Sequence, residues 1–250
     1  MIRWVGRLIA LVLLLAPSVN AAGPAAPRFR AVLVAGDGSL EVWDRGIEKL
    51  RAGLVAANAL VPGHVAQFSA RGDRAAEGIG RAELDAVVLA IESLKPAKGE
   101  ACLVYLTMHG TLDQGLYFQV SDRHLTPAML DAALTAGCGD APTFVVASGC
   151  YSGGFAAGPM ARRNRVILAA ARADLPSFGC HTDFDVTVFD GCMLFVLSSA
   201  PPNTVTLNAR LGSCVEAMET RHRMPESHPQ AWLGSAVPRL VPPLRVPRQG

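Results

Sequence analysis

The sequence predicts a single α/β domain built on a mainly parallel sheet with helices on both faces, and two observations support this. Short, continuous apolar runs alternate along the chain with longer segments in which apolar residues recur at helical spacing. The connections between them are short and no long linker interrupts them, which is the pattern of repeated strand–helix–strand units. The chain contains no internal repeat.

The predicted core strands are the short apolar runs. The first, AVLVAG at residues 31–36, is continuous and closed by a glycine, as a strand buried on both faces requires. The other core strands are expected at 64–70, 102–108, 143–147 and 165–171, with a short strand or hairpin arm at 116–120.

The predicted helices connect these strands. They are expected at 42–60, 82–94, 126–136, about 186–199 and about 206–221. The third of them has a well-defined start, because Thr126 is a suitable N-cap residue and Pro127 suits the first helical position.

The first residues carry the pattern of a secretory signal peptide. Two arginines flank the start of the apolar run LIALVLLLA, and a small-x-small cleavage signal ends at Ala21. The run is too short to cross a bilayer comfortably as a helix. We therefore expect cleavage near Ala21, export to the periplasm or the medium, and no stable membrane span afterwards. An uncleaved anchor that tethers the protein to the inner membrane is the alternative.

The chain then divides into four parts. These are a signal peptide at 1–21, a flexible lead-in at 22–27, a folded domain at 28–240 and a proline-rich tail at 241–250, which is expected to lie over the surface. Removing residues 1–21 takes away two arginines and no acidic residue. The 23 Lys and Arg then become 21, which balance the 21 Asp and Glu. No basic face suggests nucleic acid as a partner, and the oligomeric state stays open.

The six cysteines lie at positions 102, 138, 150, 180, 192 and 214. Export permits disulfides, but the spacing does not give the pairing. No C-x-x-C pair is present, which argues against a zinc ribbon or a thioredoxin-type site. If Cys150 stays free, at least one other thiol is also free.

Three glycine-rich loops are expected at one edge of the sheet, where open parallel sheets bind their ligands. They are GDGSLEVWD, HGTLDQG and SGCYSGG, each directly after a predicted strand. The last two carry His109 and Cys150 from strands that should be adjacent or nearly so. An imidazole beside a thiol can share its proton, favour the thiolate that attacks a carbonyl, and later protonate a leaving amine. The backbone N–H groups of Gly110 and Cys150 are candidates for stabilising the oxyanion.

Each of these residues also has a simpler interpretation. A cysteine after a strand is often a small core residue, and a single histidine is often structural. The joint placement of His109 and Cys150 favours chemistry. The turn fits neither the G-x-S-x-G elbow nor a phosphate-binding loop, and the histidines show no metal-ligand spacing.

Two segments, LVYLTMHG at 103–110 and FVVASGCYSGG at 144–154, resemble the core motifs of the legumain-type cysteine peptidases, which have the caspase-like fold. VLVAGDGS at 32–39 resembles the first strand and loop of that family. AAARADLPSFG at 169–179 resembles the segment that forms one wall of the pocket for the residue before the scissile bond. The resemblance implies a caspase-like three-layer sandwich with His109 as the catalytic histidine and Cys150 as the nucleophile.

The chain departs from the family pattern around the substrate pocket. Ser148 stands where legumains have an acidic residue. Legumains also carry an Arg-His pair in the loop after the first strand, and the residues of this sequence nearest to that position are Asp44 and Arg45. With Ser148, Ser177 and Asp183 they form the predicted pocket set, for which solvated or capping roles are the alternative. The legumain preference for asparagine therefore does not carry over.

The resemblance implies a cysteine endopeptidase that acts on peptide or protein substrates through a thioester, without metal or cofactor. Some relatives transfer the acyl group to an amine, so transpeptidation is a variant of the same chemistry. One alternative is a catalytically silent caspase-like module that binds peptides in the same cleft. Another is a structural protein in which Cys150 forms a disulfide.

Overall fold

The computed structural model describes Met1 and residues 27–245. The predicted signal peptide after Met1, most of the predicted lead-in and the end of the tail lie outside the described residues. Among the helices of the described part, none is long and apolar enough to cross a membrane.

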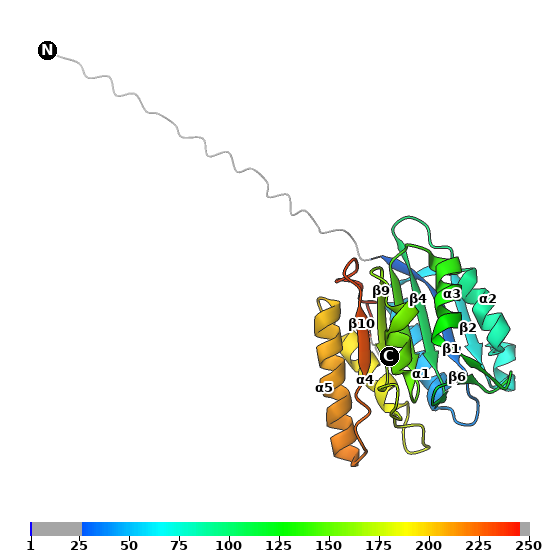
Figure 1. Cartoon of the computed structure of the whole chain (residues 1–250). Helices are drawn as coiled ribbons and strands as arrows, with labels where there is room; N and C mark the ends of the chain where they lie inside the picture. The colour runs from blue at the N-terminus through cyan, green and yellow to red at the C-terminus, as the bar shows by residue number, and fades with distance from the viewer. Residues whose placement is uncertain (2–26, 246–250) are drawn as a thin grey trace.

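A seven-stranded sheet forms the centre of the domain, in the order β10-β9-β8-β4-β1-β2-β3 (Figure 1). Neighbouring strands are parallel, except that β10 runs antiparallel to β9. The mainly parallel sheet predicted from the sequence is therefore confirmed. The strands are β1 (Arg28–Ala35), β2 (Leu60–Ser69), β3 (Gly80–Arg81), β4 (Glu100–Thr107), β8 (Thr143–Ser148), β9 (Arg165–Ala169) and β10 (Gln230–Leu233).

A small antiparallel sheet lies beyond β4. It consists of β5 (Gly110–Thr111), β6 (Gly115–Phe118) and β7 (Arg123–Leu125). The backbone N–H of Gln119 donates to the carbonyl of Gly36 at 3.0 Å, so this sheet contacts the loop after β1. The hairpin arm expected at 116–120 is thus part of a three-stranded unit at the carboxyl end of the large sheet.

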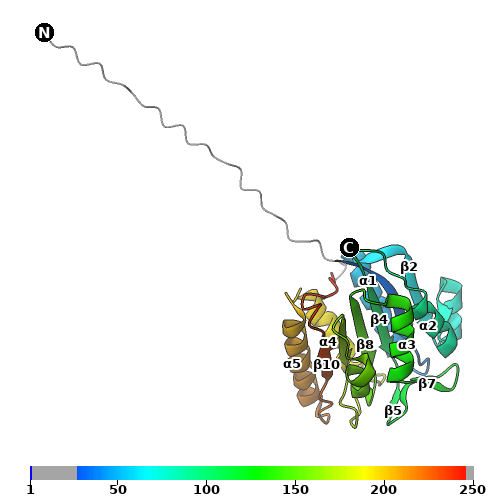
Figure 2. The same ribbon diagram turned by 45° about the horizontal axis from the view of Figure 1, so that its top comes forward.

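Helices cover both faces of the large sheet, and Figures 1 and 2 show them on its two sides. The helices are α1 (Val42–Ala56), α2 (Leu84–Glu92), α3 (Pro127–Cys138), α4 (Val188–Ser198) and α5 (Thr204–His222), with short 3-10 turns η1 (Gly72–Glu77), η2 (Ser152–Ala156) and η3 (Gly158–Met160). Helices α1, α4 and α5 pack on one face, and α2 and α3 on the other. Successive side chains of a strand point to opposite faces. Leu33 therefore joins the first core and Val34 the second, which explains why the core strands are apolar without alternation.

The described C-terminal segment contributes more to the core than the sequence suggests. The short strand β10, with the sequence QAWL, has too little periodicity to be predicted and pairs with the edge of β9. Further on, Leu244 is 7 % exposed and lies against Gly53 of α1, and the Arg245 N–H donates to the Gly53 carbonyl at 3.1 Å. This part of the proline-rich tail therefore packs against α1 with a buried side chain.

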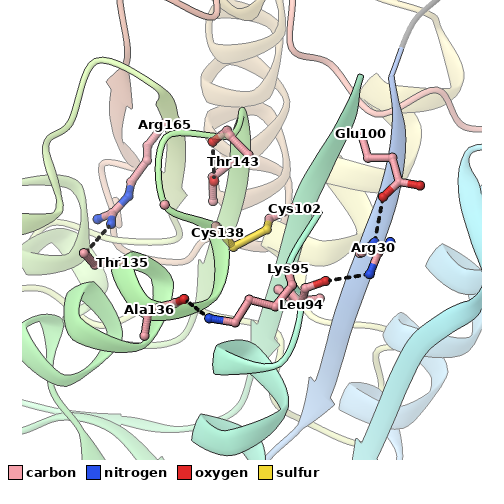
Figure 3. Close-up of a disulfide and its surroundings, with 12 residues drawn as sticks. Arg30, Leu94, Lys95, Glu100, Cys102, Thr135, Ala136, Cys138, Thr143 and Arg165 are labelled. Carbon is pink, nitrogen blue, oxygen red and sulfur yellow. Dashed lines mark hydrogen bonds and ion pairs between the residues drawn. A yellow bond between two sulfur atoms is a disulfide. The ribbon is translucent and has the colours of Figure 1, made fainter. Parts of the chain in front are cut away.

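Two disulfides join neighbouring elements. Cys102 near the start of β4 bonds Cys138 at the end of α3, and Cys192 of α4 bonds Cys214 of α5. Figure 3 shows the first of these bonds beside the ion pair of Arg30 with Glu100. Both partners of each bond lie on elements that pack together, so the pairing follows from the fold. The first bond joins residues that are 36 positions apart in the sequence. In the chain-entropy model, a disulfide that closes a loop of this length stabilises the domain by about 4 kcal/mol.

Candidate active site

His109 lies just beyond the end of β4. Met108, which precedes it, extends the ladder to the next strand, because its N–H donates to the Ser148 carbonyl at 3.0 Å. His109 is half-buried, and its ring meets the ring of Trp43 edge-on, with centroids 4.9 Å apart. Trp43 is a fully buried residue of α1. The imidazole therefore stands on the rim of the core, with one ring contact that limits its orientation.

Cys150 lies two residues beyond the end of β8, in the turn that leads into η2. The Ser177 N–H donates to its sulfur at 3.3 Å, and the thiol lies 3.5 Å from the Ser177 carbonyl oxygen, to which it donates. The Ser177 hydroxyl lies 3.8 Å from the same sulfur. The next residue, Tyr151, has a left-handed backbone with φ +56°, which is uncommon for a residue with a side chain. Such conformations persist only where the surrounding structure enforces them, and they are frequent at functional sites.

The strand register brings the two candidate residues side by side. β4 and β8 are adjacent and parallel, and Thr107 of β4 is paired with Ser148 of β8. His109 and Cys150 each follow two residues after this pair. The backbones of the two loops also touch, because a Cβ atom on Gly110 would lie 2.9 Å from the Cys150 carbonyl carbon and 3.2 Å from its nitrogen. Gly110 and Cys150, the predicted oxyanion donors, are therefore in direct backbone contact.

The glycines of these loops permit this close approach. A Cβ atom on Gly149 would lie 2.7 Å from the carbonyl oxygen of Met108, and one on Gly153 would lie 2.5 Å from the nitrogen of Ala173. Real Cβ atoms essentially never come within 3.0 Å of another heavy atom. Gly149 and Gly153 are thus needed to pack the Cys150 turn between the β4 loop and the segment that follows β9.

The predicted pocket residues separate into two groups. Ser177 contacts the Cys150 sulfur, and Ser148 is buried as the last residue of β8. Asp44 is buried on α1 near Arg74, and its carboxylate oxygens have no hydrogen-bond partner among the described residues. Burial raises the pKa of this carboxyl.

The other two pocket residues have polar side-chain neighbours. Arg45 is half-buried, pairs with Glu41 and donates to the backbone carbonyl of Asp185 at 2.7 Å. Asp183 is exposed beside His181, with 3.3 Å between the Asp183 carboxylate and the imidazole. Of the five predicted pocket residues, only Ser177 has a contact with the thiol in the described structure.

Two residues near the site escaped prediction. Cys180 is the second free cysteine of the described chain. Burial is the main cause that raises the pKa of its thiol, and the electrostatic effect of the nearby Cys150 adds to it. Asp190, in the first turn of α4, is completely buried and accepts hydrogen bonds from Tyr105 and Thr107 of β4. The sequence T-V-F-D from Thr187 to Asp190 signals a helix start. It does not reveal that the aspartate reaches the neighbouring strand.

The described residues contain no group of three His, Cys, Asp or Glu side chains that could hold a metal ion. The arrangement instead offers a thiol, an imidazole on the adjacent loop and closely packed backbone groups at one edge of the sheet. These groups suit nucleophilic attack on a carbonyl with stabilisation of an oxyanion.

Comparisons with known proteins agree with this geometry. The model of the peptidase C13 family matches residues 84–220, more than half of the chain. Among solved structures, caspase-1 from Spodoptera frugiperda has a similar fold, with a TM-score of 0.57 and 14 % identity. The similarity covers 83 % of this chain and 87 % of that chain and confirms the predicted caspase-like architecture. A search of curated protein sequences found no match.

Proposed function

Because the chain belongs to the peptidase C13 family, the legumain family of cysteine-type peptidases, we propose that Cys150 is its nucleophile and His109 its general base and acid. The observation that carries this assignment is the pairing of Thr107 with Ser148, which places both residues at the same distance beyond adjacent strand ends. The matched family region contains both residues.

In the proposed reaction, the Cys150 sulfur attacks the carbonyl carbon of a peptide bond. The thiol proton passes to the His109 imidazole, a C–S bond forms, and the carbonyl oxygen becomes an oxyanion. The backbone N–H groups of Gly110 and Cys150 are proposed to donate to that oxyanion. The Cys150 N–H supports this role, because it donates no hydrogen bond to the rest of the described chain.

Collapse of this intermediate breaks the C–N bond, and His109 gives its proton to the departing amine nitrogen. A thioester on Cys150 remains. Water then attacks the thioester while His109 takes one of its protons, the C–S bond breaks, and the released sulfur recovers a proton from the imidazolium. If an amine attacks instead of water, the product is a new peptide bond. The same thioester therefore permits endopeptidase and transpeptidase activity.

The segment after β9 is proposed to form one wall of the substrate cleft. Ser177 of this segment contacts the Cys150 sulfur through its backbone and lies near it with its hydroxyl. Since this contact fixes the segment beside the reacting atom, we propose that Ser177 contacts the substrate residue before the scissile bond. Ser148, Asp44, Arg45 and Asp183 stay weaker members of the pocket set, because none of them has a contact with the thiol.

We further propose that the protein is exported and acts outside the cytoplasm. The signal-like pattern of residues 1–21 and the two disulfides support this proposal, because disulfides persist mainly in oxidising compartments. Fractionation of producing cells, with mass determination of the mature N-terminus, tests it. We expect a chain that begins near Ala22 in the exported fraction; a full-length chain confined to the cytoplasm would contradict the proposal.

The catalytic assignment is tested with the purified mature protein, a library of peptide substrates and a thiol-reactive acyl probe. We expect the probe on Cys150, and a loss of several orders of magnitude in kcat/KM for Cys150→Ala and His109→Ala. A set of reactions with an added amine nucleophile separates hydrolysis from acyl transfer. Unchanged hydrolysis by Cys150→Ala would eliminate the mechanism.

A further inference from the structure

Asp190 is a buried carboxyl that the proposed reaction does not use directly. It lies in the first turn of α4 and is 1 % exposed. The Tyr105 hydroxyl donates to its Oδ1 at 2.7 Å, and the Thr107 hydroxyl donates to its Oδ2 at 2.6 Å. Both donors belong to the last residues of β4, the strand that leads to His109. A helix on one face of the sheet is thereby tied to the end of a central strand.

The carboxyl also packs against α1. Thr107, which donates to it, is the register partner of Ser148 at the end of β8. On the opposite side, a Cβ atom on Gly46 of α1 would lie 3.4 Å from Asp190 Oδ2, so the backbone of α1 packs closely against the carboxyl. Asp190 therefore lies beneath the end of β4, which leads to His109 and is paired with the end of β8.

Local contacts hold the carboxyl in place. The Asp190 N–H donates to the Thr187 hydroxyl at 3.1 Å, which caps α4. Burial raises the pKa of the Asp190 carboxyl, and the hydrogen bonds from Thr107 and Tyr105 oppose that rise. A buried polar group whose partners are all in place is rigid, and removing it leaves those partners unsatisfied.

We propose that Asp190 is a positioning residue that fixes the end of β4, and thereby holds His109 beside Cys150. The inference rests on the proposed function of these two residues. Asp190 acts through Thr107, which lies two residues before His109 and is paired with Ser148, two residues before Cys150. A displacement of about 1 Å between reacting groups can lower a rate about 100-fold, so a small shift of either strand end is sufficient to impair the reaction.

The test compares Asp190→Asn with the pair Thr107→Val and Thr107→Ser. The valine variant removes one hydroxyl beneath the site, and the serine variant keeps it. Two quantities are measured for each: kcat and KM on a peptide substrate, and the pH dependence of Cys150 alkylation by iodoacetamide. The second measurement reports on the imidazole–thiol pair without requiring turnover.

For Asp190→Asn we expect kcat to fall about 100-fold, with KM changed by less than about threefold. Alkylation of Cys150 should lose the pH dependence that pairing with the imidazole gives it in the wild type. Thr107→Val should change both readouts in the same direction, and Thr107→Ser should restore them. Asp131→Asn serves as the control, because Asp131 pairs with Arg165 near the start of β9 and contacts none of these residues. It should lower stability and leave both readouts unchanged per folded molecule.

Folded Asp190→Asn protein with wild-type kcat and a wild-type alkylation profile would overturn the inference. Equal losses in Asp131→Asn would also overturn it, because they would reveal a general effect of stability. If Asp190→Asn does not fold, the Thr107 pair decides the matter, since equal behaviour of its valine and serine variants contradicts the proposal. Failure of the proposed function has a different signature: hydrolysis that persists in Cys150→Ala, whatever the Asp190 variants do.

Discussion

Replacing Gly110 with alanine tests the contact between the two loops that form the candidate site. The added Cβ atom would overlap the Cys150 carbonyl oxygen and lie 2.9 Å from the Cys150 carbonyl carbon. Each of these atoms belongs to the backbone, so no side chain can rotate away to make room. The substitution therefore forces the β4 loop and the Cys150 turn apart.

The size of the expected loss in rate follows from the distance by which the two loops must separate. Restoring ordinary contact requires a relative shift on the order of 1 Å, which is enough to cost about 100-fold in rate when it separates a nucleophile from its base. Gly110 and Cys150 are also the proposed oxyanion donors, and losing one such donor costs about 100- to 1000-fold. Overpacking of this kind destabilises a fold by about 1–3 kcal/mol, which corresponds to a fall of about 2–4 °C in Tm for each kcal/mol.

The assay measures kcat/KM on a fluorogenic peptide and Tm by calorimetry. We expect a loss of at least about 100-fold in kcat/KM, while most of the protein stays folded at 25 °C. Gly154→Ala is the matched control in the same turn, because its Cβ atom would lie 3.7 Å from the Pro127 side chain, an ordinary contact. It should stay within about twofold of wild type. Full activity in folded Gly110→Ala would refute the described packing of the two loops.

Two further predictions concern the cysteines and a buried ion pair. Alkylation of the native, unreduced protein followed by mass spectrometry should modify Cys150 and Cys180 only, with the other four cysteines modified after reduction; a native protein with Cys150 in a disulfide contradicts this. Asp131→Asn leaves Arg165, which is 1 % exposed, without its carboxylate and should lower the free energy of unfolding by about 3–5 kcal/mol at pH 7. Burial alone would raise the pKa of Asp131, but hydrogen bonds from Arg162 and Arg165 outweigh it and lower that pKa below 3.8. A carboxyl with a lowered pKa stabilises the fold above its unfolded pKa and loses that effect as the pH falls through the folded value. The difference between wild type and Asp131→Asn in urea unfolding should therefore shrink below about pH 4, and a constant difference down to pH 2 would contradict it.

Most of the large sheet follows from the sequence, because strands buried on both faces must be apolar throughout. Residues 31–36 and 143–147 illustrate this, since they lie within β1 and β8 apart from Gly36 just beyond the end of β1. Local chemistry also predicts the start of α3, where the Thr126 hydroxyl accepts from the Met129 N–H at 3.2 Å and Pro127 opens the helix. The antiparallel β10 was not predicted, because its stability comes from pairing with the edge of β9 and not from its own pattern.

In the candidate site, too, some features follow from the sequence and others depend on tertiary packing. The positions of His109 and Cys150 at one edge follow from topology, because carboxyl ends of parallel strands meet there. The partners of these residues come from distant segments. Ser177 approaches Cys150 from the long connection before α4, and Asp190 reaches Thr107 across 83 residues of sequence. Contacts of this kind leave no local periodicity. The family resemblance placed Ser177 in the pocket set, whereas the contact of Asp190 becomes visible only when the elements are packed.

The proposed export and the proposed thiol chemistry place opposite demands on cysteine. An oxidising compartment favours disulfides, whereas the nucleophile must stay a thiol. In this fold, the disulfides and the Cys150 thiol lie in different parts of the domain. Cys102 and Cys138 join a strand to the helix packed on it, Cys192 and Cys214 join two neighbouring helices, and the Cys150 sulfur is instead held by the backbone of Ser177. The cross-links thus stabilise the layers on which the candidate site is built, while the sulfur of the proposed nucleophile stays outside them.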